Sequence, residues 1–346
     1  SKPYFGTPLV PSAFATQGVN GVVVTNDGRT VDARMLRQNY NVTDSDMSAL
    51  TTWTKLKANW QPTDWMEFRN QTYYYTAKRD WMSAETYTLD AGTQQLGRDR
   101  FLVQHDQSVI GDRLEVQLNH PIAGFKNRFV SGIDFTYTDF KRPSFFNGAV
   151  DTVDPFSPNQ GLFGGGSTAL QTATILDTAF FAEDQFSVTD RLKLVAGTRT
   201  DAIHLDREGF TATGASNALQ TFSQNFTATT WRAGVVYDVL PEATVYGQYA
   251  TAVDPVSSSL FVARANQKFE LATGMQWEVG AKGQFWNKRA EWTVAYFDIV
   301  RKNILTQISQ IDALNVGRQS SKGVELDVAA KLTDAWRIQG NITFLS

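Results

Sequence analysis

Long runs of alternating side chains, joined in pairs by short polar turns, most constrain the fold of this chain. Residues 277–285 alternate apolar with polar side chains, and so does the run after the turn Asn287-Lys288-Arg289. Since the side chains of a strand alternate between its two faces, this stretch predicts a hairpin with one apolar and one charged face. Each arm has about ten residues, whereas ordinary strands have about five or six. Strands of this length with one apolar face are typical of sheets that face lipid.

The same hairpin pattern recurs along the chain and predicts about twelve strands, with boundaries good to about three residues. Besides 277–306, the paired arms are 53–60 with 66–76, 107–119 with 127–141, 178–187 with 192–206, 226–238 with 244–252, and 323–331 with 336–344. The turns inside hairpins are short, but the connections between hairpins are long: 77–105, 143–176, 207–224, 253–275 and 304–317. Such long irregular connections are uncommon in compact soluble domains, and short turns at one rim with long loops at the other are typical of outer-membrane barrels. The pattern predicts an all-β chain, an antiparallel transmembrane β-barrel segment with short periplasmic turns and long extracellular loops.

The charged faces of the predicted strands support a water-filled interior. Glu278 and Lys282 lie on the inner face of one hairpin, and Glu325 and Asp327 on that of another. A dry interior would leave such charges without partners, and lipid on the other face requires the sheet to close so that no backbone edge is exposed. Residues 1–40 fit this pattern poorly. Their Asn26-Asp27-Gly28 signal predicts a turn within a long loop, although strands there remain an open alternative.

Composition excludes several classes of protein. There is no cysteine, so disulfides, thiol nucleophiles and zinc ribbons are excluded. The histidines His105, His120 and His204 are scattered without metal-ligand spacing, so no metal site is expected. A net charge of -3 gives no basis for nucleic-acid binding, and no apolar run approaches the roughly 18 residues of a transmembrane helix. No catalytic arrangement stands out: the glycine-rich segment 161–170 lacks the lysine of a phosphate-binding loop, and the carboxylates of 151–160 fit a solvated loop better than a calcium site.

Aromatic residues are abundant and many flank the predicted turns. The chain has 23 Phe, 11 Tyr and 9 Trp. Trp60 and Trp65 lie on either side of one turn, Trp286 and Trp292 on either side of another, and Trp336 directly follows a third. Membrane barrels place aromatic girdles at the two interfaces, so these positions favour a barrel over a soluble sandwich.

Four segments, in order along the chain, resemble the TonB-dependent siderophore receptors. "DTAFFAEDQFSVTDRLKLVAGTRTD" (residues 177–201) is similar to a FxxDxxxxTDRxxLxxGxRxD segment of that family, and "WEVGAKGQFWNKRAEWTVAYFDIVRKNILT" (277–306) resembles its E-x-G-x-K-x-x-F…A-Y-F-D-I-x-x-x-N hairpin. "NVGRQSSKGVELDVAAKLTDAWRIQGNITF" (315–344) resembles a G-x-x-x-S-x-G-V-E-L-E segment with its following strand, and "KPYFGTPL" (2–9) is similar to a proline-tyrosine-glycine stretch of an outer loop. The resemblance covers most of 1–346 and is densest over 177–346.

The resemblance implies a 22-stranded barrel in the bacterial outer membrane, plugged by an N-terminal domain. Such a receptor binds a ferric siderophore at its outer face and imports it intact with energy from TonB; it is not an enzyme and needs no cofactor besides the iron carried in its ligand. No plug, TonB box or closing C-terminal strand is recognisable in 1–346, which is therefore expected to be an internal segment with about 12 of the 22 strands. TonB is expected to act through an N-terminal segment absent from this sequence, and the lumenal charges Glu278, Lys282, Glu325 and Asp327 are expected to line a hydrated wall facing the plug.

A ferric chelate with aromatic arms needs π-faces and cations around it. Long loops and outward strand ends supply the candidates, which are Tyr73, Tyr75, Arg79 and Trp81 by the first loop, Phe140, Arg142, Phe145 and Phe146 by the second, and Phe261, Arg264 and Lys268 in the fourth. Tyr73 and Tyr75 fit an aromatic girdle equally well. Because aromatics outnumber cations in these loops, a catecholate is favoured over a hydroxamate.

Three other classes of protein remain open. A porin or a receptor for haem, cobalamin or carbohydrate shares the barrel pattern. A haem receptor needs an outer histidine ligand, and only His105 falls in a predicted long loop. A soluble β-propeller or sandwich array also alternates, but propeller connections are similar in length, unlike the uneven loops here.

Overall fold

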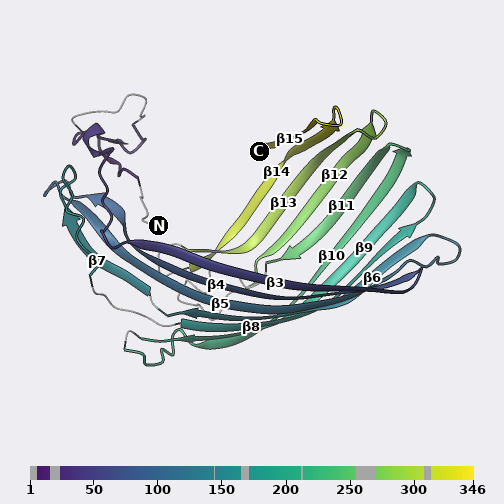
Figure 1. Cartoon of the computed structure of the whole chain (residues 1–346), viewed down its shortest axis with the longest axis horizontal. Coiled ribbons are helices and arrows are strands. Elements are labelled where there is room, and N and C mark those ends of the chain that lie inside the picture. The colour runs from purple at the N-terminus through teal and green to yellow at the C-terminus, as the bar shows by residue number, and fades with distance from the viewer. Residues whose placement is uncertain are drawn as a thin grey trace.

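The computed structural model describes residues 6–15, 24–143, 145–164, 171–211, 213–254, 270–307 and 313–346, with the side chains of 145–150, 305–307 and 313–316 left undescribed. Almost all of this is one antiparallel sheet of 13 strands. In sheet order from one edge, the strands are β15, β14, β13, β12, β11, β10, β9, β8, β6, β5, β4 and β3, and β7 pairs with β5 beyond this path. The sheet curves strongly between its edge strands β3 and β15 (Figure 1). Among the described residues, no helix is long and apolar enough to cross a membrane.

The strands are much longer than those of an ordinary sheet. Their bounds are β3 Asp46–Thr63, β4 Met66–Leu89, β5 Leu96–Leu118, β6 Asn127–Arg142, β7 Phe145–Val153, β8 Gln171–Ser187, β9 Leu192–Gly209, β10 Phe222–Leu240, β11 Ala243–Val253, β12 Thr273–Phe285, β13 Ala290–Gln307, β14 Ala313–Lys331 and β15 Arg337–Leu345. All six predicted hairpins are present, and Asn287 and Lys288 adopt positive φ in the turn of the β12–β13 hairpin.

The prediction of a loop over 77–105 was wrong. Strands β4 and β5 continue to Leu89 and from Leu96, so only the intervening turn is irregular. The predicted loop 143–176 also contains β7. Alternation of apolar and polar side chains identifies only the part of a strand that contacts lipid. Beyond that part both faces of the strand carry polar side chains, although the hydrogen bonds between the strands continue.

The outer face of the sheet carries a band of exposed apolar side chains. On each strand they occupy every second position, and they include Leu56, Leu114, Ile133, Phe180, Leu194, Val235, Val279, Leu326 and Ile342. The alternate positions carry the charged residues that the sequence places inside. Trp231, Tyr249 and Trp277 pack ring against ring on the outer face, with centroids 4.9 and 4.6 Å apart. This arrangement matches an interfacial aromatic girdle.

The apolar band ends at Tyr74, Ile110, Tyr137 and Leu176. Beyond it the outer face becomes charged: Lys78 Nζ lies 3.7 Å from Asp106 Oδ2, and His204 Nε2 is bonded to Asp206 Oδ2 at 2.8 Å. Because charged side chains avoid hydrocarbon, the parts of β4–β9 beyond this line lie outside the membrane-spanning region. They form the wall of what is here called the vestibule, above the lumen.

A cluster of three polar side chains lies within the apolar band. The Asp112 carboxylate accepts hydrogen bonds from Asn70 Nδ2 at 2.9 Å and from Thr72 Oγ1 at 2.5 Å. All three side chains project from the outer face of β4 and β5, in register with Leu114 and Ile110. Neighbouring donors therefore satisfy a carboxylate that faces lipid.

A compact layer, called the cap from here on, covers the tips of β4, β5 and β7. The cap consists of three segments: the short strand β1 Val10–Pro11, residues 24–45 and residues 154–163 (Figure 1). Residues 24–45 include the short strand β2 Arg29–Thr30 and the helix η1 Ala33–Met35. The Asn26-Asp27-Gly28 signal forms a turn before β2, in which Gly28 has a φ of 75°. Apolar residues from distant segments form the core of the cap, namely Val10, Met35, Tyr40, Leu96 and Val153.

Two buried arginines hold the cap together. Arg98 Nε and Arg100 Nη1 donate to the Asp151 carboxylate at 2.8 and 2.7 Å. Their remaining N–H groups donate to the carbonyls of residues 40, 159, 160, 162 and 163. Burial alone would raise the pKa of Asp151, but its hydrogen bonds to these arginines and their charges lower it to about 2. Segments more than 50 residues apart in sequence thus meet at one carboxylate.

Thr86 occupies a strained conformation at the β-bulge near the tip of β4. It is exposed, and its φ is 66°, a region that β-branched residues rarely adopt. We expect Thr86→Gly to increase the free energy of unfolding by about 0.5–1 kcal/mol because glycine removes the strain. Thr88→Gly, at an exposed position of ordinary strand conformation two residues on, is the matched control and should lower it by a similar amount. Equal changes in denaturant unfolding of the full-length protein would contradict the assignment of strain.

Candidate functional site

Aromatic and cationic side chains line the vestibule wall on the lumen-side face of β4 and β5. The guanidinium carbon of Arg79 lies 4.5 Å from the centre of the Trp81 ring, and this ring packs edge-on against Phe101 with centroids 6.4 Å apart. Trp81 Nε1 donates to Ser83 Oγ at 2.9 Å, which orients the indole. These three residues, Arg79, Trp81 and Phe101, are here called the vestibule group. A cation beside two π-faces can bind an anionic aromatic ligand by stacking and charge.

A second set of basic residues lies beside the vestibule group, on β5, β6 and β9. His105 pairs with Arg79 across the strands, and its ring packs against Phe140 at 5.2 Å. Arg142 and Arg207 are almost completely buried on the same face. Burial and the charges of Arg142 and Arg79 lower the pKa of His105 to about 4. Burial lowers the pKa of Arg142 to about 10. Burial and the charge of Arg142 likewise lower the pKa of Arg207 to about 10. At neutral pH the histidine is therefore neutral, and the two arginines keep their charge.

A third set, deeper in the lumen, lies on β3 and β4. The Lys55 ammonium lies 3.9 Å from the centre of the Trp53 ring, and Tyr75 packs edge-on against the same ring with centroids 5.8 Å apart. Trp53, Lys55 and Tyr75 are here called the lumen group. Tyr73 lies next to them, but its ring covers Gly111 and its hydroxyl hydrogen-bonds Thr136 Oγ1 at 3.1 Å. Tyr73 is thus fixed in the wall by two neighbouring strands.

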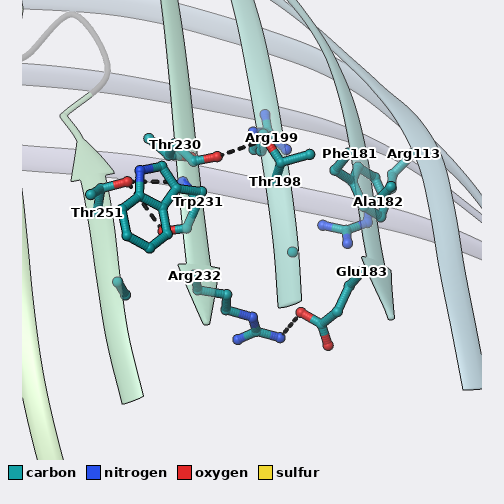
Figure 2. Close-up of a pocket in the computed structure, with 12 residues that line it drawn as sticks. Arg113, Phe181, Ala182, Glu183, Thr198, Arg199, Thr230, Trp231, Arg232 and Thr251 are labelled. Atoms are coloured by element: carbon teal, nitrogen blue, oxygen red, sulfur yellow. Dashed lines mark hydrogen bonds and ion pairs between the residues drawn. The ribbon is translucent and has the colours of Figure 1, made fainter. Parts of the chain in front are cut away.

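Ion pairs cover the lumen wall below the vestibule. Arg69 bonds Glu115 at 3.2 Å, Arg113 lies 4.0 Å from Asp134, and Arg199 bonds Asp134 at 3.0 Å. In the pocket of Figure 2, Arg232 reaches across to Glu183, and Arg113 lies against the ring of Phe181. The other two arginines of this pocket, Arg113 and Arg199, lie within ion-pair distance of Asp134 beside it. The wall is thus charged but internally neutralised, which suits contact with water.

The structure brings together some of the predicted ligand-binding residues and not others. Arg79, Trp81 and Arg142 share the vestibule wall, while Tyr75 belongs to the lumen group and Tyr73 is anchored beside it. Phe145 and Phe146 lie in β7 opposite Val103 and Leu102, but their side chains are outside the described part of the structure. Phe261, Arg264 and Lys268 lie outside the described residues altogether.

The four predicted lumenal charges lie where the sequence placed them. In the described sheet Glu278, Lys282, Glu325 and Asp327 occupy the positions that alternate with the exposed apolar residues of β12 and β14. His105, assigned to a loop by the sequence, lies instead within β5. Sequence reasoning did not single out Trp53, Lys55, Phe101 or Arg207, which belong to these three sets. For Trp53 and Lys55 a signal existed, because both fall on the polar face of an alternating run.

The fold and sequence match known outer-membrane proteins. A family model described as "TonB dependent receptor-like, beta-barrel" matches residues 3–346. The chain is 28% identical over 180 residues to the probable TonB-dependent siderophore receptor PiuA of Acinetobacter baumannii, covering 50% of this chain and 24% of that protein. It is 26% identical over 259 residues to the ferrioxamine B receptor of Salmonella typhimurium, covering 74% of this chain and 34% of that protein.

A solved structure shows the same fold over nearly the whole chain. It is the closed form of the ferric-catecholate import receptor Fiu from E. coli K12, with a TM-score of 0.80 at 18% sequence identity, covering 99% of this chain and 53% of that one. The chain spans about half or less of the length of each of these proteins.

Proposed function

Because the chain belongs to the TonB-dependent receptor family, as part of its β-barrel, we propose that the full-length protein binds a ferric siderophore at its extracellular face and imports it with energy supplied through TonB. As a member of this family, the chain lies in the bacterial outer membrane. The family consists of transport receptors, and we propose that this protein likewise moves its ligand without chemical change. The proposal includes no resident cofactor, since the iron enters as part of the ligand.

The vestibule group is the observation that carries the ligand class. Arg79 and Trp81 already make a cation–π contact above the end of the lipid-facing band, on the wall that also carries Arg142 and Arg207. A ferric tris-catecholate carries aromatic arms and negative charge, so it matches both properties. A hydroxamate chelate lacks the aromatic arms and matches the wall less well. The proposed ligand is therefore a catecholate, in keeping with the name of the structural neighbour Fiu.

Haem is the alternative that the structure tests most directly. Its recognition by an outer histidine would fall to His105. In the structure His105 Nε2 is buried, makes no hydrogen bond to any described atom, and lies beneath Phe140 and between two arginines. A buried nitrogen cannot reach the iron of a large planar ligand without rearrangement of β5 and β6. This geometry favours a chelate over haem.

The proposed function is tested by quenching of tryptophan fluorescence in the purified full-length protein. We expect saturable quenching, with a sub-micromolar Kd, by a ferric tris-catecholate and not by its iron-free form. Ferrioxamine B, haem and cobalamin form the comparison panel. Folded protein that binds none of these would contradict the receptor assignment, and binding of haem or cobalamin alone would replace the ligand class.

Substitutions in the vestibule group should weaken catecholate binding. We expect Arg79→Gln and Trp81→Ala each to raise the Kd by about tenfold, because each removes a charge or a π-face worth about 1–2 kcal/mol. Lys78→Gln is the matched control for Arg79→Gln: it removes the same charge one residue away, on the outer face, where Lys78 pairs with Asp106. Equal effects of Arg79→Gln and Lys78→Gln would assign the loss to net charge rather than to this site.

A further inference from the structure

Three exposed cations lie on the outer face of β13 and β14, directly beyond the apolar band. Tyr296 on β13 and Val324 on β14 are the last exposed apolar residues of the band on these two strands. The positions that follow on the same face carry Lys322 and then the facing residues Lys302 and Arg318. These three cations, Lys302, Arg318 and Lys322, are here called the outer basic group. They border the surface that faces lipid.

The outer basic group lies at the height where the outer face becomes charged elsewhere on the sheet. Lys302 is as many residues from the first residue of β13, Ala290, as Lys78 is from the first residue of β4, Met66. Both strands begin at the rim with the short turns, and the strands of a barrel share a similar tilt, so the two lysines have a similar height. Lys78 lies beyond the apolar band. Lys302 therefore lies in the layer where lipid headgroups meet the barrel.

The charge of the outer basic group is not compensated as it is for the lysines on β4 and β6. Lys78 Nζ lies 3.7 Å from Asp106 Oδ2, and Lys141 Nζ lies 3.8 Å from Asp139 Oδ1, all on the outer face. Among the residues that the structure describes, the three cations of the outer basic group form no ion pair. On β4 to β6 acidic side chains thus balance the lysines, whereas on β13 and β14 the positive charge stays available to an outside anion.

Lys302 and Arg318 are direct cross-strand neighbours, an arrangement that favours a bound anion. Residues so placed have their Cβ atoms about 4.5–5.5 Å apart, and like charges there repel each other. On its other side Lys302 faces the neutral Thr273 of β12. In the described sheet the one carboxylate on the outer face of β12 to β14 is that of Asp298, and it stands opposite Lys322. An anion between Lys302 and Arg318 removes their repulsion, and both side chains bind phosphate oxygens well.

We propose that the outer basic group binds the phosphate groups of an anionic lipid headgroup in the outer leaflet, while the acyl chains of that lipid lie along the apolar band below. Two features set this occupant. The positive charge has no acidic partner in the described sheet, and it continues directly into a surface of exposed apolar side chains, which a soluble anion does not need. The inference goes beyond the proposed function and does not depend on which ligand the receptor imports. It assigns a preferred lipid position to one part of the barrel circumference.

The test measures lipid binding by the purified full-length protein in detergent. The probe is lipid A with both of its phosphates, and its Kd is measured by native mass spectrometry. We expect Lys302→Gln/Arg318→Gln to raise this Kd by about tenfold, because each basic residue at a lipid surface contributes to binding of the headgroup. Lys302→Arg/Arg318→Lys keeps both charges and should bind within about twofold of wild type. Lys78→Gln/Lys141→Gln is the matched control: it removes the same charge from lysines that have acidic partners, and its Kd should also stay within about twofold.

Four results would overturn the lipid site. The first is an unchanged Kd in Lys302→Gln/Arg318→Gln, and the second is an equal rise in Lys78→Gln/Lys141→Gln, which would assign the loss to net charge. The third is equal affinity of the wild-type protein for lipid A without phosphates, since the acyl chains alone would then account for binding. The fourth is displacement of lipid A by inorganic phosphate at equal concentration, which would assign the cations to a soluble anion. Heat-induced gel shift checks that each variant is folded before it is scored.

Binding of a ferric chelate separates this inference from the proposed function. We expect Lys302→Gln/Arg318→Gln to bind a ferric tris-catecholate with the wild-type Kd, because the outer basic group faces away from the vestibule group. A lipid Kd that rises while the chelate Kd stays constant supports the lipid site. A parallel loss of both affinities indicates a general disturbance of the barrel and rejects it. Wild-type protein that binds lipid A but no chelate would defeat the proposed function alone.

Discussion

Asp151→Asn is expected to destabilise the extracellular cap strongly, because it removes the carboxylate that two buried arginines share. Arg98 and Arg100 are 1% and 7% exposed, and both bond the Asp151 carboxylate. Removing one partner of a buried ion pair leaves uncompensated charge and costs about 3–5 kcal/mol. Asp151 is itself 41% exposed, so solvent screening places the expected loss near the lower end, about 3 kcal/mol. The measurement is hydrogen exchange of peptides covering 84–98 and 151–163 in the full-length protein, where exchange should become much faster.

The ion pairs of Arg98 and Arg100 with Asp151, here called the clamp, also predict how the stability of the cap depends on pH. The pKa of Asp151 is lowered from 3.8 to about 2 in the folded protein, so its stabilising contribution is complete above pH 3.8 and is lost as the pH falls through about 2. Asp99→Asn is the matched control, because Asp99 lies between the two arginines in sequence and has no ion pair among the described residues. If Asp99→Asn loosened the cap as much as Asp151→Asn does, the clamp would not be its main support.

Gly111→Ala should destabilise the barrel wall through a steric clash. A Cβ at this position would lie 2.3 Å from the ring of Tyr73, which covers the glycine from the opposite strand. Overpacking of this kind costs about 1–3 kcal/mol, and here it also displaces the hydroxyl that bonds Thr136. We expect the free energy of unfolding to fall by about 2 kcal/mol in denaturant titration of the full-length protein.

A double variant identifies the cause of that loss. Tyr73→Ala removes the clashing ring, so Gly111→Ala should cost little in a Tyr73→Ala background, with a coupling energy of at least about 1 kcal/mol. Gly340→Ala in β15 is the control substitution, since a Cβ there meets nothing within 4 Å and alanine suits a strand better than glycine. Additive effects of Gly111→Ala and Tyr73→Ala would show that the ring does not cause the strain.

The lipid-facing part of the fold could be predicted from sequence because its side-chain period is two. The assignment of Trp277 and Val279 to one face and of Glu278 and Lys282 to the other is confirmed, since only the first two are exposed apolar residues of the outer band. The vestibule wall could not be predicted in the same way. Arg79, Trp81 and His105 lie in strands whose two faces both meet water, so their alternation carries no hydrophobic signal. A segment without apolar alternation is therefore predicted as a loop, although these residues lie in strands β4 and β5.

Long-range contacts explain the remaining differences between sequence and structure. Tyr40 donates to the carbonyl of Pro155 and Gln38 to that of Phe156, across more than 110 residues of sequence. No local pattern indicates that residues 24–45 pack against 154–163, so the cap could not be predicted. The proximity of Arg142 and Arg207 could not be predicted for the same reason. The two arginines lie on β6 and β9, which are brought together by the strand β8 between them. Whether the predicted ligand-binding residues contact a ligand stays a prediction.

The ion pairs of the lumen wall have a consequence for how the sheet assembles. If a hairpin pairs with its neighbour two residues out of register, every apolar side chain still faces lipid, so contacts with lipid do not disfavour the wrong register. Ion pairs on the lumen face do disfavour it. Arg199 of β9 pairs with Asp134 of β6 across β8, and Arg232 of β10 pairs with Glu183 of β8 across β9. A two-residue slip moves one partner by about 7 Å and breaks such a pair. The charged interior thus selects the correct alignment among those that the membrane would accept equally.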